Sequence, residues 1–115
     1  MPDATHDDEI VYHLLLDEPE AEITGRALRL LISDEAHERE IRRLAREVIA
    51  SLEQPADAHG TLVVSLTPQQ MKITHTALRL LLNDLQREQA DEIELLRGIL
   101  DKLPDEHTMR AIELE

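Results

Sequence analysis

One stretch of this sequence occurs twice. Residues 23–31 read Ile23-Thr24-Gly25-Arg26-Ala27-Leu28-Arg29-Leu30-Leu31, and 50 positions later residues 73–81 read Ile73-Thr74-His75-Thr76-Ala77-Leu78-Arg79-Leu80-Leu81. The match extends to Asp34 and Asp84. We interpret the repetition as an internal duplication, so that both copies should adopt the same secondary structure.

Both copies have the pattern of a helix that is buried on several sides. On a helical wheel the apolar residues of 19–32 cover roughly 200°, about twice the arc of an ordinary surface helix. We therefore expect helices over 19–32 and 68–82 that pack between other elements. Thr24 lies within the apolar arc, where its hydroxyl can bond a carbonyl one turn earlier. The start of the second helix is marked by Thr67-Pro68-Gln69-Gln70, which predicts an N-cap and a capping box.

Each of these helices is flanked by the same kinds of element. Residues 10–16 and 61–66 have the composition of β-strands, and the first has apolar residues on both faces, which predicts cover on both sides. Residues 35–52 and 91–103 have the narrower apolar stripe of amphipathic helices. The predicted fold is α+β and mostly helical, with a strand–helix–helix unit that occurs twice, pseudo-twofold symmetry and a small sheet. Residues 105–114 are compatible with either a short helix or a third strand.

The chain length of 115 residues predicts a single domain over 1–115. We divide it into a first half over 9–54, a linker over 53–60, a second half over 61–103 and a C-terminal extension over 104–115. Two strands make a weak sheet on their own. We therefore expect a homodimer that extends the sheet or buries a helical face.

The composition excludes several classes of function. The chain has no Cys, which excludes disulfides, thiol catalysis and cysteine-ligated zinc. It has no Trp or Phe, and its net charge of −13 repels phosphate backbones and anionic lipids. We expect no nucleic-acid partner and no membrane partner. The acidic N-terminus has no apolar core of a signal peptide, so we expect a cytoplasmic protein.

The sequence gives no pattern for a metal, a cofactor or a catalytic residue. No two His are four residues apart, and His37-Glu38-Arg39-Glu40-Ile41 lacks the second His of a zinc-protease helix. A non-local metal site with added Asp or Glu stays open as an alternative to scattered surface His. No nucleophile elbow and no phosphate-binding glycine loop is present. The six His are His6, His13, His37, His59, His75 and His107.

A basic stripe is predicted on the exposed face of the helix over 35–52. It either docks an acidic partner or phosphates, or it is a solvated face on which Arg and Glu pair at i, i+4 spacing. The stripe consists of Arg39, Arg42, Arg43 and Arg46, and the pairs would be Glu35–Arg39, Glu38–Arg42 and Arg43–Glu47.

Arg29 and Arg79 occupy equivalent positions of the repeat, on otherwise apolar helices. We interpret them as a pair close to the pseudo-axis. They either form salt bridges with Asp34, Asp84 or neighbouring carboxylates, or they bind an anion on the axis.

The preferred functional prediction is a small non-enzymatic protein-interaction or regulatory module that acts as a homodimer and has a protein partner. The first alternative is a small-molecule or metal-binding module, with its site between the two halves or across the dimer. The second alternative is an enzyme, or a subunit of one, whose site forms only across a dimer.

Overall fold

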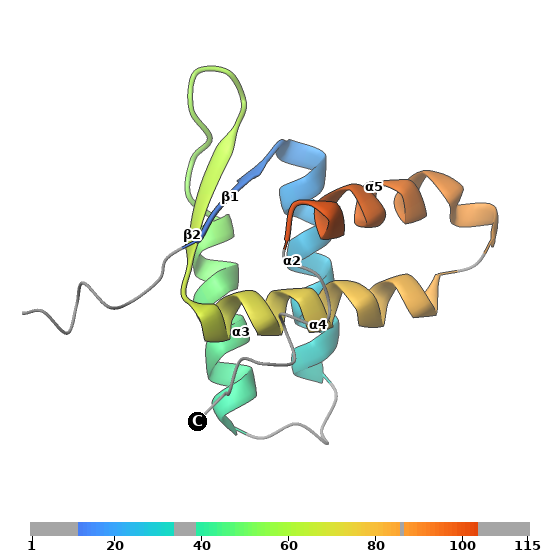
Figure 1. Cartoon of the computed structure of the whole chain (residues 1–115), viewed down its shortest axis with the longest axis horizontal. Helices are drawn as coiled ribbons and strands as arrows, with labels where there is room; N and C mark the ends of the chain where they lie inside the picture. Colours follow the sequence, from blue (N-terminus) through green and yellow to red (C-terminus); the bar gives the residue numbers. More distant parts are fainter. Residues whose placement is uncertain (1–11, 34–38, 86, 104–115) are drawn as a thin grey trace, which may run out of the picture.

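The computed structural model of the chain describes residues 12–33, 39–85 and 87–103. These residues form a mostly helical α+β fold with a small two-stranded antiparallel sheet (Figure 1), as the sequence predicted. The predictions for residues 34–38 and 105–114 lie outside the described part of the chain. In chain order the elements are β1 (Tyr12–Leu16), α2 (Glu18–Ser33), α3 (Arg39–Leu52), β2 (Leu62–Leu66), α4 (Pro68–Asp84), the 3-10 helix η1 (Arg87–Gln89) and α5 (Ala90–Asp101).

The sheet consists of β1 and β2 with Leu14 directly opposite Val64. Alternate residues of both strands point toward the helices and are buried: Leu14 and Leu16 on β1, and Leu62, Val64 and Leu66 on β2. The outward residues of both strands are exposed. The prediction that the first strand is covered on both faces is therefore wrong for His13 and Leu15, because the sheet buries only one of its two faces.

Helices α2 and α4 form the centre of the helical layer. Each of them contacts the other and also contacts both α3 and α5. Ala27 and Leu28 of α2 are completely buried, and so are Ala77 and Leu78 of α4. The prediction that these two helices pack between other elements is confirmed. Figure 1 shows α5 beside the C-terminal half of α4, whereas α3 crosses near the N-terminal end of α4.

The N-termini of α2 and α4 are capped in the same way. At α4 the Gln70 N–H donates to Thr67 Oγ1 (3.2 Å) and the Thr67 N–H donates to Gln70 Oε1 (3.0 Å), which confirms the predicted capping box. At α2 the Glu20 N–H donates to Asp17 Oδ1 (2.9 Å) and the Asp17 N–H donates to Glu20 Oε1 (3.0 Å). This second box was not predicted, although Asp-x-x-Glu has the spacing that it needs.

One buried Thr in each central helix bonds its own backbone. The hydroxyls of Thr24 and Thr74 donate to the carbonyls of Glu20 and Gln70, both at 2.8 Å. Both side chains are buried in the core. The hydrogen bond satisfies each hydroxyl where no water is available, as predicted for Thr24.

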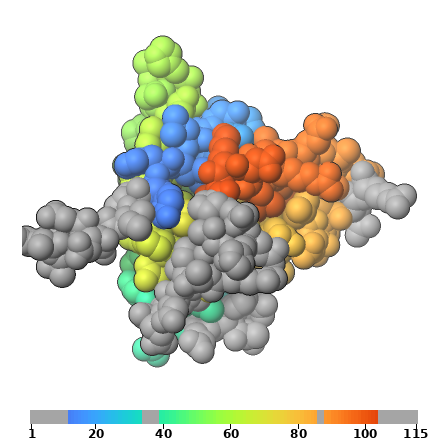
Figure 2. Space-filling model, viewed as in Figure 1, coloured from blue at the N-terminus to red at the C-terminus, as the bar shows by residue number. Residues whose placement is uncertain are grey.

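The connection between α3 and β2 ends in a turn organised by Asp57. Its Oδ1 accepts the N–H groups of His59 (2.8 Å) and Thr61 (2.9 Å). Gly60 has a φ of 78°, a conformation that residues with a Cβ adopt only with strain. Figure 2 shows this turn as a projection from the surface, next to the strands.

Candidate functional site

Helices α2 and α4 present corresponding faces to the rest of the molecule. From residue 23 to residue 33, each position is buried, half-buried or exposed in the same way as the position 50 residues later. The last turns of the two helices therefore have the same pattern of buried and exposed positions. These last turns line a cavity between the two halves of the chain.

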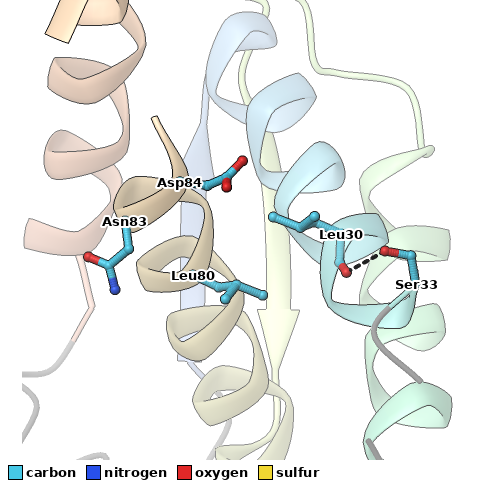
Figure 3. Close-up of a pocket in the computed structure, with 5 residues that line it drawn as sticks. All are labelled: Leu30, Ser33, Leu80, Asn83 and Asp84. Carbon is cyan, nitrogen blue, oxygen red and sulfur yellow. Dashed lines mark hydrogen bonds between the residues drawn. The ribbon is translucent and has the colours of Figure 1, made fainter. Parts of the chain in front are cut away.

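The cavity lies between the C-terminal turns of α2 and α4 and has a volume of about 350 Å³. Its walls are Leu30 and Ser33 from α2, and Leu80, Asn83 and Asp84 from α4. In Figure 3, Leu30 and Leu80 extend toward one another across the cavity, and Asp84 extends from α4 toward α2. Two pairs of the lining residues, 30 with 80 and 33 with 83, are 50 residues apart. We refer to this cavity as the α2/α4 pocket.

The α2/α4 pocket has one charged lining residue, Asp84, and lies at the last turns of two helices. The last carbonyls of a helix lack intrahelical donors and carry the negative end of the helix dipole. Neither α2 nor α4 has a basic residue in its last turn. One of the carbonyls, that of Leu30, accepts the Ser33 hydroxyl at 2.8 Å. Among the described side chains, none forms an ion pair with Asp84.

A second groove of about 330 Å³ lies between α2 and α3 and contains Arg29. Arg29 Nη2 lies 3.7 Å from Glu53 Oε2, and both side chains are largely exposed. Arg79 is exposed on α4 and lines neither this groove nor the α2/α4 pocket. Of the predicted partners, Asp34 lies outside the described residues, whereas Asp84 lines the α2/α4 pocket.

Arg26 joins α2 to α5. Its Nη1 lies 2.7 Å from Glu92 Oε2. The hydrogen bond from Arg26 lowers the pKa of Glu92 below the ordinary value, and a further hydrogen bond from Gln89 acts in the same direction. This ion pair therefore favours the ionised form of Glu92 in the folded protein.

The four Arg of the basic stripe lie along α3, but they differ in how far their side chains are exposed. Arg39, Arg43 and Arg46 are exposed, whereas Arg42 is half-buried. Arg43 Nη1 lies 2.7 Å from Glu47 Oε2, which is the predicted i, i+4 pair. Arg43 also bonds Glu40, and this hydrogen bond lowers the pKa of Glu40 and raises that of Arg43. The contacts of Arg43 are those of a solvated face. Glu35 and Glu38 lie outside the described residues.

The open face of the sheet carries an apolar pair. Leu15 and Val63 are directly opposite in the register, and each is 52% exposed. Beside them, His13 Nδ1 and Ser65 Oγ are hydrogen-bonded at 3.1 Å. We refer to His13, Leu15, Val63 and Ser65 as the open sheet face.

The histidines do not converge on a metal site in the described part of the chain. Among the described residues, no group of three or more His, Cys, Asp or Glu could hold a metal ion. His13 and His59 are exposed, but His75 is buried, with 8% of its surface exposed. The interpretation of the histidines as scattered surface residues is therefore wrong for His75. His6, His37 and His107 lie outside the described residues.

Sequence reasoning missed the polar residues of the α2/α4 pocket. The signal available was the end of the repeat, where Ser33 and Asn83 follow the last apolar residues at the same spacing in both copies. That spacing alone did not show that the last turns of both helices line one cavity.

Comparison with protein-family models, with curated proteins and with solved structures finds no match to this chain. Among the described helices, none has the length and apolar character that crossing a membrane would require.

Proposed function

We propose that the protein is a non-enzymatic interaction module that acts as a homodimer, with the open sheet face at the centre of the contact between two copies. The observation that supports this proposal is the exposure of Leu15 and Val63, which form a continuous apolar patch because they are opposite partners. Isolated exposed apolar residues are common on protein surfaces, whereas adjacent ones suit an interface.

The distribution of charge supports a second copy as the occupant. Two chains that each carry a net charge of −13 repel one another over most of their surfaces. The open sheet face contains no carboxylate among its four outward side chains. Two copies can therefore approach there without bringing like charges into contact. A twofold arrangement would place the patch of one copy on the identical patch of the other.

The size of the sheet sets a limit on this interface. Two strands of 5 residues each cover roughly 160 Å², from a rise of about 3.4 Å per residue and a strand spacing of about 4.8 Å. A stable interface buries about 800 Å² on each partner. The contact must therefore extend over the surface that surrounds the sheet, and we expect a dimer of micromolar affinity.

The oligomeric state as a function of concentration tests the proposal. We expect light scattering after size-exclusion chromatography to show a dimer above roughly 10 µM that dissociates on dilution. Leu15→Lys or Val63→Lys should weaken the dimer at least tenfold, because the contact would bury like charges. Ala50→Lys, on the exposed side of α3, is the matched control and should leave the dimer intact. A monomer at all concentrations, or equal weakening by all three variants, would contradict the proposal.

We also infer that the chain arose by duplication of a strand–helix–helix unit and that its halves are related by a pseudo-twofold axis. A twofold rotation that exchanges two antiparallel strands must pass through a pair of equivalent residues. Leu14 and Val64 are 50 positions apart and directly opposite, which supports this inference. The two capping boxes and the two buried Thr hydroxyl bonds, each at the same spacing, support it further.

A further inference from the structure

The α2/α4 pocket combines an acidic group with apolar walls. Asp84 provides a carboxylate, and Leu30 of α2 and Leu80 of α4 provide hydrocarbon from the two walls. Figure 3 shows that the carboxylate of Asp84 and the Leu30 side chain both extend into the space between the two helices. A ligand that suits both the carboxylate and the two Leu walls has a cationic head and an apolar body.

The C-terminus of α4 adds to the charge of Asp84, because Asp84 is the last residue of that helix. Each helix C-terminus carries the equivalent of about half a negative charge. In many helices a Lys or Arg in the last turn offsets this charge, but α2 and α4 have no basic residue there. A cation bound near Asp84 would therefore interact favourably with the dipole of α4 and with the carboxylate. The net charge of the chain, −13, would attract such a cation from a distance.

The dimensions of the pocket suit a small group. Its volume of about 350 Å³ lies at the lower end of the range for small-molecule sites. The half-buried Leu30 and Leu80 can cover a short alkyl chain. A hydrated metal ion would make no use of these two walls, whereas an alkylammonium group suits both the Leu side chains and the Asp84 carboxylate.

We propose that the α2/α4 pocket binds an alkylammonium group. The ammonium lies against Asp84, and the alkyl chain lies on Leu30 and Leu80. The site is independent of the proposed dimer contact, since no residue of the open sheet face lines it. The source of the group is either a free amine or a lysine side chain of another protein.

Titration of the full chain with n-pentylammonium, followed by amide chemical shifts in NMR spectra, tests the proposal. We expect shifts centred on Ser33, Asn83 and Asp84, with a dissociation constant on the order of 1 mM for so small a ligand. n-Pentanol has the same hydrocarbon without the charge, and it should bind at least about threefold more weakly. Equal binding of the two compounds, or shifts elsewhere in the molecule, would overturn the proposal.

A pair of matched variants separates the pocket from the general acidity of the chain. Asp84→Asn keeps the shape of the side chain and should weaken n-pentylammonium binding about threefold to tenfold. Asp101→Asn removes the same charge from the last residue of α5, outside the pocket, and should leave the binding unchanged. If both variants weaken binding alike, the amine responds only to net charge and the pocket is not its site.

The last comparison distinguishes the source of the alkylammonium group. A short blocked peptide with one lysine is titrated beside n-pentylammonium, together with the same peptide after Nε-acetylation. Tighter binding of the lysine peptide would identify a protein lysine as the ligand, and tighter binding of the free amine would identify a small molecule. Binding of the acetylated peptide as tight as that of the lysine peptide would contradict the proposal, because the acetyl group removes the charge.

Discussion

Lys102, directly after α5, bonds to β1 and to the first turn of α2. Its Nζ donates to the Leu15 carbonyl and to Glu20 Oε1, both at 2.8 Å. The residue follows α5, whereas its two acceptors belong to β1 and to the first turn of α2. We predict that Lys102→Met destabilises the fold by about 1.5–2 kcal/mol.

This magnitude follows from the exposure of the groups. Hydrogen bonds to charged groups contribute about 1.5–3 kcal/mol when they are buried, and exposed ion pairs about 0.2–1 kcal/mol. The Lys102 side chain is 40% exposed and that of Glu20 only 12%. The ion pair should therefore contribute near 1 kcal/mol and the bond to the Leu15 carbonyl about half to one. Met keeps the apolar stem of the side chain, so little packing is lost.

The assay is urea denaturation followed by circular dichroism, in a double-mutant cycle with Glu20→Gln. Gln retains an acceptor for the Asp17 N–H, so the capping box can persist. We expect a coupling energy of about 0.5–1.5 kcal/mol between residues 20 and 102. In thermal unfolding Lys102→Met should lower Tm by about 5–10 °C. A coupling below about 0.3 kcal/mol would refute the assignment of the stability to this ion pair.

Three further predictions concern stability. Gly98→Ala should stabilise the protein by about 0.5–1 kcal/mol in urea denaturation, because Gly98 lies within α5 and an added Cβ meets no atom within 4 Å. A destabilised variant would contradict the prediction that the added methyl group is accommodated without a clash. Leu28→Ala and Leu78→Ala should each cost about 2–5 kcal/mol, since both side chains are completely buried, and a difference above about 1 kcal/mol would count against equivalent environments. The pKa of Glu92 is lowered by Arg26, so its contribution is present above the ordinary value of 4.5 and is lost as the pH falls through the folded-state pKa. The stability difference between wild type and Glu92→Gln should therefore shrink from pH 6 to pH 3, and a constant difference would exclude this linkage.

Local patterns of the sequence were sufficient for the elements and for several of their hydrogen bonds. The capping box of Thr67 and Gln70 and the internal bond of Thr24 form between residues three or four positions apart. Such contacts depend on helical geometry alone, which the apolar periodicity indicates. The wide apolar arcs also predicted correctly that α2 and α4 pack between other elements, because an apolar surface of that width requires more than one partner.

The ion pairs between distant segments could not be predicted from local patterns. The pairing of Arg26 with Glu92 spans 66 residues and that of Lys102 with Glu20 spans 82. Nothing in the local sequence distinguishes these charges from others in a chain with 25 acidic residues. Arg29 and Arg79 were predicted as a pair because they repeat in the sequence. The pocket is instead lined by Leu30 and Leu80, one position further along each helix.

By itself, the sequence determined which segments of the described chain become helices and strands, and that α2 and α4 are buried on several sides, because these properties follow from periodicity within about ten residues. Only the tertiary structure decided which face of the sheet stays open and which residues of α2 and α4 line a common cavity. Leu15 and Leu16 are neighbours of the same chemical type, yet one is 52% exposed and the other completely buried. The difference arises because the helices pack on one side of the sheet, and that choice depends on the whole fold.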